Sequence, residues 1–202
     1  MQSLIDVVSL MKRAIFPLPV FILPCGYTRL RIFEPRYLEM VKESLKTEQG
    51  FVLCQYDIDS YLNVPKYGCL VDIIDFSQDK HGQLLIDVVA TSVVEINDVC
   101  ENKQQLRYGQ LSATENIFWF QQPRQFANKD KYLQTALQQL FASNEQLNEL
   151  YRETHFNELN WVVARWLELL PISIDKKQQL AFESDFANIH SFLHTVINNE
   201  FS

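Results

Sequence analysis

Glycine is scarce in this sequence, and its spacing excludes two kinds of catalytic loop. The 202 residues contain five glycines, at Gly26, Gly50, Gly68, Gly82 and Gly109. A P-loop that holds phosphate needs a glycine followed by Lys, and no glycine here precedes a Lys. A serine nucleophile elbow needs a glycine two residues before and two residues after the serine, which this spacing also excludes. We therefore expect no enzyme of these classes, no catalytic residues and no nucleotide or other cofactor.

Long apolar runs and clusters of positive charge are also missing. No stretch approaches the ~20 apolar residues that a membrane-spanning helix requires, and no run of Lys and Arg is longer than two. The formal net charge is −7, whereas DNA and anionic membranes attract proteins that have concentrated basic faces. We therefore expect no DNA partner and no membrane partner.

We expect neither a secretory leader nor a disulfide framework. Lys12 and Arg13 follow the first apolar run, which reverses the order found in signal peptides. The cysteines are unevenly spaced and form no Cys-x-x-Cys pair: Cys25, Cys54, Cys69 and Cys100. Reduced thiols in a cytoplasmic protein are the expected state.

The first part of the chain has the apolar pattern of short strands. With 47% hydrophobic residues the chain can bury a real core. Strands are predicted from Phe16, from Tyr27, and at 51–56, 67–76, 83–90, 93–96, 106–115 and 117–120. The polar segment 79–82 predicts the turn of a hairpin. Short, closely spaced strands of this kind indicate a small, partly closed barrel.

One helix interrupts these strands. Pro35 suits the first helical position because its missing N–H has no partner there, and Glu34 then stands at the cap. The helix is predicted to run to about Lys46 and to end before Gly50. Helical spacing assigns four side chains to its core face: Tyr37, Leu38, Val41 and Leu45.

From about Lys129 the apolar period changes to about 3.6 residues, which predicts a bundle of about four helices. One stripe contains Leu133 and Phe141, and another runs from Leu159 to Leu170 and ends at Pro171. Asp175 with Gln178 resembles a capping box. Ser184 can cap a last helix that carries apolar residues at Phe186, Ile189, Leu193, Val196 and Ile197.

Three blocks of the sequence resemble the Lon protease N-terminal domain, also called the Lon substrate-binding domain. They are Phe16–Tyr37, Tyr67–Gly68 with the following hairpin, and Leu169–Pro171 with Asp175–Gln178. The resemblance is to free-standing bacterial versions, which lack the ATPase and protease domains. Cys25 and Cys69 depart from the family pattern, which usually has Pro before the turn glycine and Thr after the second glycine. Neither change threatens the fold, since both substitutes are small.

The resemblance implies an α+β fold, a PUA-like β pseudo-barrel with one inserted helix, followed by a C-terminal α-helical bundle. We expect an N-terminal extension at 1–13, the barrel subdomain at 14–123 and the helical subdomain at 124–202. Met11 would be a natural start, so Met1 and Met11 are alternative native starts. The extension is otherwise a short leading helix with Leu4, Val7, Val8 and Met11 on one face.

Two segments supply aromatic and arginine side chains for a binding surface. Tyr27, Arg29 and Arg31 are expected to alternate along the second strand, and aromatics beside Arg are typical of protein-recognition patches. The segment Phe118–Phe120 adds Phe118, Trp119 and Phe120. The alternatives are ion pairs of Arg29, Arg31 and Arg36 with Glu34 or Glu39, and burial of the aromatics between the two subdomains.

Other polar groups have a weaker claim to chemistry. His190 and His194 stand four apart on a predicted helix, a spacing that can bind one metal ion if a third ligand such as His155 is added. We do not assign a metal site, since histidines at a bundle edge also bond to neighbours or solvent. The remaining groups are expected to be structural: Asp57 and Asp59 in a loop, Asp72, Asp75 and Asp87 on strands, and the thiols of Cys54 and Cys69.

The predicted function is non-enzymatic recognition of protein or unfolded polypeptide, as the resemblance implies, with a role as an adaptor in protein turnover. The expected mechanism is apolar burial plus backbone pairing at a barrel edge or in a groove between the subdomains. The alternatives are single-stranded RNA binding by the PUA-like barrel and a small-ligand or metal site at His190 and His194. RNA binding predicts a continuous positive groove, and peptide binding predicts an apolar one. The sequence gives no oligomeric state.

Overall fold

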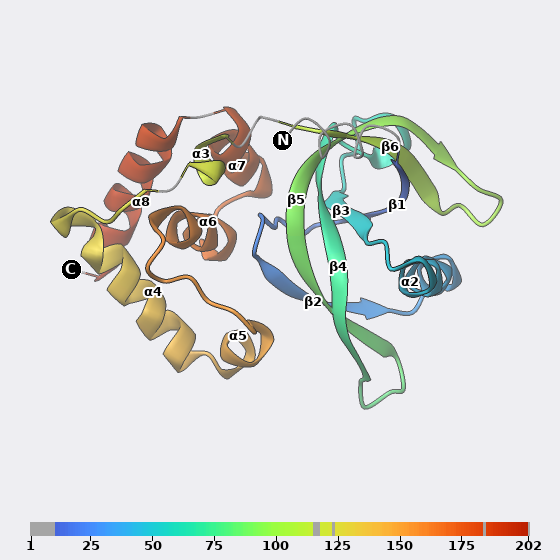
Figure 1. Ribbon diagram of the computed structural model, residues 1–202, viewed down its shortest axis with the longest axis horizontal. Coiled ribbons are helices and arrows are strands. Elements are labelled where there is room, and N and C mark those ends of the chain that lie inside the picture. Colours follow the sequence, from blue (N-terminus) through green and yellow to red (C-terminus); the bar gives the residue numbers. More distant parts are fainter. Residues whose placement is uncertain (1–10, 115–117, 123, 184, 202) are drawn as a thin grey trace. The chain divides into compact units, whose positions relative to one another are not determined.

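The computed structural model describes residues 11–114, 118–122, 124–183 and 185–201 (Figure 1). The chain divides into two compact units, Met1–Thr114 and Glu115–Ser202, which we call the barrel unit and the helical unit. The sequence placed the boundary between residues 123 and 124. The observed division lies earlier because Phe118–Gln121 forms a helix, α3, instead of the predicted strand, and this helix packs within the helical unit.

Over residues 11–114, the barrel unit combines a six-stranded sheet with one long helix, which confirms the α+β class. Its elements in chain order are β1 (Met11–Leu18), β2 (Tyr27–Ile32), α2 (Pro35–Thr47), β3 (Phe51–Gln55), the 3-10 turn η1 (Tyr61–Asn63), β4 (Tyr67–Gln78), β5 (Leu84–Glu101) and β6 (Arg107–Ala113). The strand order is β2-β5-β4-β3-β1-β6, and β6 also pairs with β5. Strands β5, β4, β3, β1 and β6 therefore form a closed ring.

The length of β5 makes this closure possible. The two strands predicted at 83–90 and 93–96 form one continuous strand of 18 residues that runs beside β4 (Figure 1). The first part of β5 pairs with β2, from Leu84 to Val89, and the last part pairs with β6, from Val94 to Glu101. The β4–β5 hairpin is confirmed, and its turn is held by Asp79, whose Oδ1 accepts from the N–H groups of His81 and Gln83.

The predicted N-terminal extension ends too late. Met11, Lys12 and Arg13 belong to β1 and pair with Leu111, Gln110 and Gly109 of β6. The strand predicted from Phe16 accordingly begins at Met11 and ends at Leu18. Residues 1–10, with the alternative leading helix and the alternative starts, lie outside the described residues.

The turn before β2 places an unexpected residue in the left-handed region. The N–H of Gly26 donates to the carbonyl of Leu23 over 2.9 Å, which closes a turn with Pro24 and Cys25 at its centre. Cys25, and not Gly26, has a positive φ, of 59°. Residues other than Gly and Asn rarely adopt this backbone conformation, so the turn contains local strain at Cys25.

Helix α2 begins as predicted, with Pro35 in its first turn and Glu34 at the N-cap. Its buried residues are Tyr37, Met40, Val41 and Ser44. The predicted core position of Leu45 is wrong, because this side chain is 49% exposed. The helix ends at Thr47, before Gly50 as predicted, and Glu48 takes the left-handed conformation that glycine most often adopts at helix ends.

The helical unit is built around α6. Its elements are α3 (Phe118–Gln121), the 3-10 turn η2 (Asn128–Asp130), α4 (Lys131–Ser143), α5 (Glu145–Leu150), α6 (Leu159–Leu169), α7 (Ile174–Gln178), the π-helical turn η3 (Gln179–Glu183) and α8 (Phe186–Phe201). Both predicted apolar stripes are confirmed, since Leu133, Leu137 and Phe141 are buried and α6 is buried from Leu159 to Leu167.

The caps of the last helices differ from the predictions. Ser173 caps α7, because its side chain accepts from the N–H of Lys176, whereas Asp175 was expected in that role. Asp185 accepts from the N–H of Asn188 in the first turn of α8. The predicted cap, Ser184, lies outside the described residues. Polar side chains one or two positions apart can each accept from N–H groups of the same first turn, so the pattern alone does not decide between them.

Candidate functional site

The arginines predicted to form a binding surface on β2 are engaged in ion pairs. Arg29 lies opposite Asp87 of β5 and binds it twice, Nε to Oδ1 at 2.6 Å and Nη2 to Oδ2 at 2.8 Å. Arg31 Nε lies 3.3 Å from Asp79 Oδ2. Both partners differ from the predicted Glu34 and Glu39, whereas the predicted pairing of Arg36 with Glu34 is confirmed, since Arg36 Nη2 lies 2.7 Å from Glu34 Oε2. Tyr27, at the start of β2, is half-buried, and the binding role of Tyr27, Arg29 and Arg31 stays a prediction.

The aromatic segment Phe118–Phe120 does not form one surface. Trp119 is buried, and its Nε1 donates to the carbonyl of Ala181 over 3.0 Å. Its ring lies 5.9 Å from the ring of Phe120 and 6.0 Å from that of Phe186, centroid to centroid. Phe120 is half-buried, and the side chain of Phe118 lies outside the described residues. Trp119 is therefore part of the interior of the helical unit.

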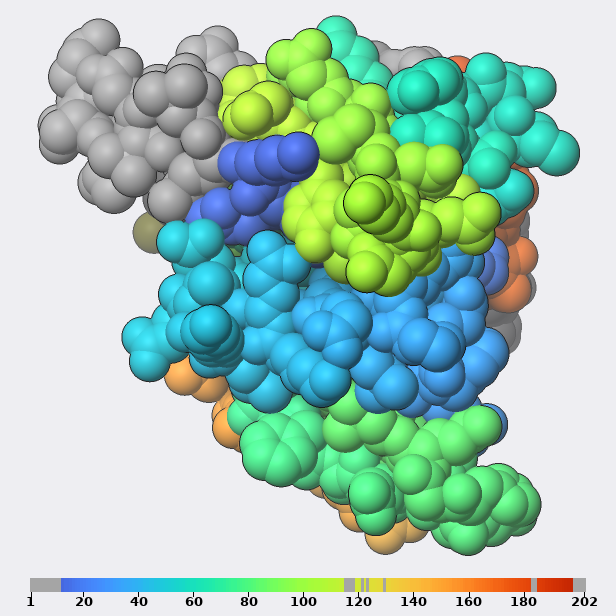
Figure 2. All heavy atoms as spheres, turned by 90° about the vertical axis from the view of Figure 1, so that its right-hand side faces the viewer, coloured from blue at the N-terminus to red at the C-terminus, as the bar shows by residue number. Residues whose placement is uncertain are grey.

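A groove in the barrel unit separates α2 from the end of the β5–β6 hairpin. Figure 2 shows the face where the blue α2 and the yellow-green β5–β6 segment meet. The groove has a volume of about 470 Å³. Its lining residues are Arg36, Glu39, Lys42, Glu43, Lys46 and Thr47 from α2, and Asn102, Gln104, Leu106 and Tyr108 from the hairpin.

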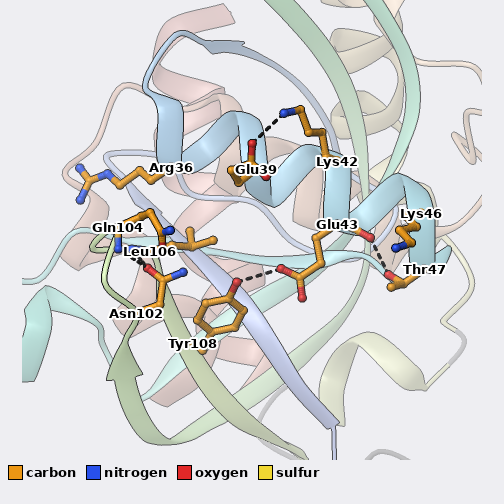
Figure 3. A pocket seen from close by; sticks show the side chains of 10 residues that line it. All are labelled: Arg36, Glu39, Lys42, Glu43, Lys46, Thr47, Asn102, Gln104, Leu106 and Tyr108. Atoms are coloured by element: carbon orange, nitrogen blue, oxygen red, sulfur yellow. Dashed lines mark hydrogen bonds and ion pairs between the residues drawn. The ribbon is translucent and has the colours of Figure 1, made fainter.

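A hydrogen bond joins the two walls of this groove. Tyr108 OH donates to Glu43 Oε2 over 2.8 Å (Figure 3). Burial, and next the hydrogen bond and charge of Glu43, raise the pKa of Tyr108 to about 12, so its hydroxyl remains a donor near neutral pH. Leu106 is buried at the base of the groove. The Oδ1 of Asn102 accepts from two backbone N–H groups, those of Gln104 and Leu106, which fixes the hairpin end.

The groove continues past Tyr108 into a second hollow of about 430 Å³. The second hollow is lined by Lys12, Glu43, Cys100, Glu101, Asn102 and Tyr108, so the two share three residues. Together they expose four basic side chains and three acidic ones: Lys12, Arg36, Lys42 and Lys46 against Glu39, Glu43 and Glu101. This is not the continuous positive groove that RNA binding predicts, and it is not the apolar groove that we predicted for peptide binding.

Only one wall of this groove could be predicted from the sequence. The charged residues of α2 recur at helical spacing, so an exposed polar face could be predicted from them. The opposite wall could not, because Asn102 and Gln104 lie in an irregular turn far along the chain. Only the closure of the barrel by β5–β6 pairing brings Tyr108 next to Glu43.

The structure brings His190 and His194 together, but not with the third residue that we named. His155 Nδ1 lies 3.4 Å from Glu158 instead. The residue that joins the pair is Asp130, whose Oδ1 lies 2.9 Å from His190 Nε2 and 3.1 Å from His194 Nε2. Asp130 is separated from the pair by about sixty positions in the sequence, so no local motif indicates it.

The other polar groups that we considered have structural environments. Burial raises the pKa of the Cys54 thiol to about 12, which disfavours the reactive thiolate. The Sγ of Cys69 donates to the carbonyl of Ile22 over 3.0 Å. In the loop, Asp57 accepts from the N–H of Asp59 and from the hydroxyl of Ser60. Asp75 faces Asp87 across the hairpin, where Asp87 is bound by Arg29.

Comparisons with known proteins identify the family. Residues 12–188 match the family model described as "ATP-dependent protease La (LON) substrate-binding domain". The fold resembles a Lon N-terminal domain protein from Xanthomonas campestris, with 24% identity, a TM-score of 0.69, and coverage of 93% of this chain and 99% of that one. It also resembles the N-terminal domain of Mycobacterium avium complex Lon protease, with 12% identity, a TM-score of 0.59, and coverage of 91% of this chain and 96% of that one. No curated protein sequence matches the chain.

In the described parts of the chain, no helix is long and apolar enough to cross a bilayer.

Proposed function

Since the chain belongs to the Lon substrate-binding domain family, we propose that it recognises polypeptide through the groove between α2 and the β5–β6 hairpin. The family assignment supports substrate recognition as the general role. The groove is our choice of surface because it is concave and has side chains of both charges beside amide groups.

The mixed polarity of the lining is the observation on which this proposal depends. A polypeptide offers N–H donors, carbonyl acceptors and charged side chains of both signs. Glu39 and Lys42 form an ion pair 2.7 Å long on one wall, and Gln104 lies on the other. An extended segment, which rises about 3.3 Å per residue, can exchange hydrogen bonds with both walls. Electrostatic complementarity of this kind gives selectivity for a charge pattern.

The Tyr108–Glu43 hydrogen bond lies where the two hollows meet. A segment that runs through both hollows replaces this bond with its own polar groups. The cost is small, because an intramolecular hydrogen bond that exchanges with water contributes only about 1 kcal/mol. We propose that a bound segment separates these two side chains and then contacts each of them.

We further propose that the protein is a non-enzymatic adaptor that delivers bound polypeptide to protein turnover in the cytoplasm. The family assignment supports the link to turnover. The four cysteines are not joined in disulfides, which supports a reducing compartment, since reduced cysteines are typical of cytoplasmic proteins.

Binding to an array of unstructured peptides, followed by fluorescence anisotropy on the best of them, tests the proposal. For an acidic peptide we expect Lys46→Glu to weaken binding about tenfold, because a favourable contact becomes a repulsive one. The matched control is Lys80→Glu in the β4–β5 turn, which makes the same charge change at an exposed site outside the groove. Hydrogen exchange should slow in α2 and in residues 101–108 when the peptide binds.

Two results would overturn this choice of surface. Equal weakening by Lys46→Glu and Lys80→Glu would mean that only net charge matters. Loss of binding in Arg31→Glu, with no effect of Lys46→Glu, would move the site to the β2 surface that the sequence predicted. Absence of binding to every peptide would remove polypeptide recognition itself.

A further inference from the structure

Three side chains of the helical unit converge on one point. Asp130 Oδ1, His190 Nε2 and His194 Nε2 form a triangle with sides of 2.9, 3.1 and 3.0 Å. Asp130 ends the turn before α4, and the two histidines lie one helical turn apart on α8. The carboxylate is 4% exposed, and the imidazoles are 14% and 22% exposed, so the cluster is partly buried but reachable from solvent.

The three contacts of this triangle cannot all be hydrogen bonds at the same time. An ionised carboxylate only accepts, so each Nε2 that faces Asp130 Oδ1 must carry a proton. The two Nε2 atoms, 3.0 Å apart, are then both donors aimed at the same oxygen. If one Nε2 gives up its proton to accept from the other, its lone pair faces the carboxylate oxygen. A cation at the point of convergence removes this conflict, since all three atoms can then donate electron pairs to it.

The distances fit a small divalent ion. Imidazole nitrogen and carboxylate oxygen bind Zn²⁺ at about 2.0–2.2 Å. An ion about 2.1 Å from each of the three atoms lies outside the plane that they define. The angles between its three bonds are about 90°, as on one face of an octahedron. Two histidines and one carboxylate on a face are the donor set of several transition-metal sites, in which the remaining positions stay open. Imidazole donors disfavour Mg²⁺ and Ca²⁺, which prefer oxygen.

The groups behind these three residues hold them in place. The second oxygen of Asp130, Oδ2, accepts from the N–H of Ala127 over 3.1 Å, which leaves Oδ1 facing the histidines. The hydroxyl of Tyr132 lies 2.6 Å from His194 Nδ1. The ring of Phe186 stacks on His190 with centroids 5.6 Å apart. Metal-binding histidines almost always have a partner on the second ring nitrogen, because that contact fixes the tautomer and the ring orientation.

We propose that Asp130, His190 and His194 form a binding site for a divalent first-row transition-metal ion, with Tyr132 orienting His194. The site joins the start of α4 to α8, so the bound ion links two helices of the helical unit. This inference does not depend on the proposed polypeptide-binding function, because the groove lies in the barrel unit.

Titration of the metal-free protein with Zn²⁺, followed by calorimetry, tests the site. We expect one Zn²⁺ per chain and a rise in Tm, because an ion that binds the folded chain more tightly than the unfolded chain stabilises it. His194→Ala and Asp130→Asn should each weaken binding at least about tenfold. The matched control is His155→Ala, which removes the histidine paired with Glu158 in the same unit and should leave the affinity unchanged.

A second measurement covers variants that fold poorly. In the intact protein, nitrogen NMR of the imidazoles should show Zn²⁺-induced shifts at His190 and His194, and Co²⁺ should give visible absorption bands of a nitrogen- and oxygen-bound ion. Zn²⁺ that fails to bind stoichiometrically, that leaves these imidazole signals in place, or that binds His155→Ala at least tenfold more weakly would overturn the proposal. The cluster would then be a hydrogen-bonded contact between α8 and the segment before α4.

Discussion

The barrel unit and the helical unit contain ion pairs that differ in burial. In the barrel unit the Arg29–Asp87 pair is 47% and 15% exposed, and the Lys42–Glu39 pair is 72% and 61% exposed. In the helical unit Arg165 is fully buried, and its Nη2 lies 2.8 Å from Glu168 Oε1, in a side chain that is 8% exposed. The Arg165–Glu168 pair of the helical unit is thus buried on both sides, whereas the two barrel-unit pairs keep their basic side chains exposed.

The difference follows from how strands and helices use their backbone. In the barrel unit, hydrogen bonds between strands join the elements, so the interior can be apolar: Ile15, Val52, Val94, Ile96 and Leu111 form one cluster. Helices satisfy their own backbone groups, so contacts between them depend on side chains. In the helical unit, polar side chains therefore reach backbone carbonyls of other segments, as Trp166 Nε1 does to Leu133 and Lys177 Nζ does to Glu168.

The chain contains a natural probe for each unit. The three tryptophans, Trp119, Trp161 and Trp166, all lie in the helical unit. The four cysteines all lie in the barrel unit, and Cys54 and Cys69 are buried. Tryptophan fluorescence therefore follows unfolding of the helical unit, and the reactivity of the buried thiols follows unfolding of the barrel unit.

The largest effect should come from breaking the buried pair. Glu168→Ala leaves the guanidinium of Arg165 buried without its carboxylate, which typically costs about 3–5 kcal/mol. Urea unfolding followed by tryptophan fluorescence measures this loss. The control is Glu39→Ala, which breaks the exposed pair with Lys42 and should cost under about 1 kcal/mol. Because Glu39 lies in the barrel unit, the reactivity of the buried thiols in urea measures this second loss. Equal losses in the two variants would remove the contrast between the units.

Alkaline pH should weaken the barrel unit through Cys54. Its pKa is raised by burial from 9.0 to about 12, so the unfolded chain loses this proton first. The contribution of Cys54 to the free energy of unfolding is fully present below pH 9.0. It decreases as the pH rises toward 12, by up to about 1.4 kcal/mol per pH unit. Tyr108, whose pKa is also raised to about 12, acts in the same direction.

Denaturant unfolding followed by far-UV circular dichroism, from about pH 8 to about pH 11, measures this slope. Cys54→Ala should be somewhat less stable at neutral pH because it leaves a small cavity. Its stability should nevertheless fall less steeply with pH than that of the unaltered chain. Identical slopes would show that Cys54 does not titrate in the way that its burial implies.

Gly109→Ala tests close packing inside the barrel. A Cβ on Gly109 would lie 2.6 Å from Ile96 Cγ2 and 2.9 Å from Ile15 Cδ1. Gly109→Ala should therefore destabilise the barrel unit by about 1–3 kcal/mol, with earlier reaction of the buried thiols in urea. The tryptophan transition is the internal control. If it shifts by the same amount, the two units unfold as one, and the comparison between them no longer holds.

The smallest effect is expected at the surface of the barrel. Arg29→Gln and Asp87→Asn should each change stability by under about 1 kcal/mol, because an exposed ion pair gains little over solvated charges. A double-mutant cycle in urea measures the coupling between them. A coupling above about 2 kcal/mol would mean that this bidentate pair behaves like the buried pair in the helical unit.

Several elements could be predicted from local sequence, because local physics decides them. Pro35 sets the start of α2, and the apolar stripes give α4, α6 and α8. The predictions were wrong where contacts with another part of the chain decide which side chains are buried or which element forms. Leu45 has a core spacing, but α2 buries Met40 and Ser44 instead, and Phe118–Phe120 reads as a strand although Trp119 is buried in the helical unit.

The candidate sites were predictable only in part. The sequence indicated the spacing of His190 and His194, and the charged face of α2 could have been predicted from helical spacing although we did not name it. It gave no sign of Asp130 or of the Tyr108–Glu43 contact, because each requires the fold to bring distant segments together. The arginines of β2 were visible, but their carboxylate partners depend on the β2–β5 register.

By itself, the sequence determined the family, the class of fold and the approximate limits of most elements, because these depend on periodicity, caps and turns within short segments. Only the tertiary structure decided the closed ring of strands, the groove beside α2 and the convergence of one carboxylate with two imidazoles. Each of these requires contacts between residues far apart in the chain, and the energy of such contacts depends on burial and geometry that no local pattern contains.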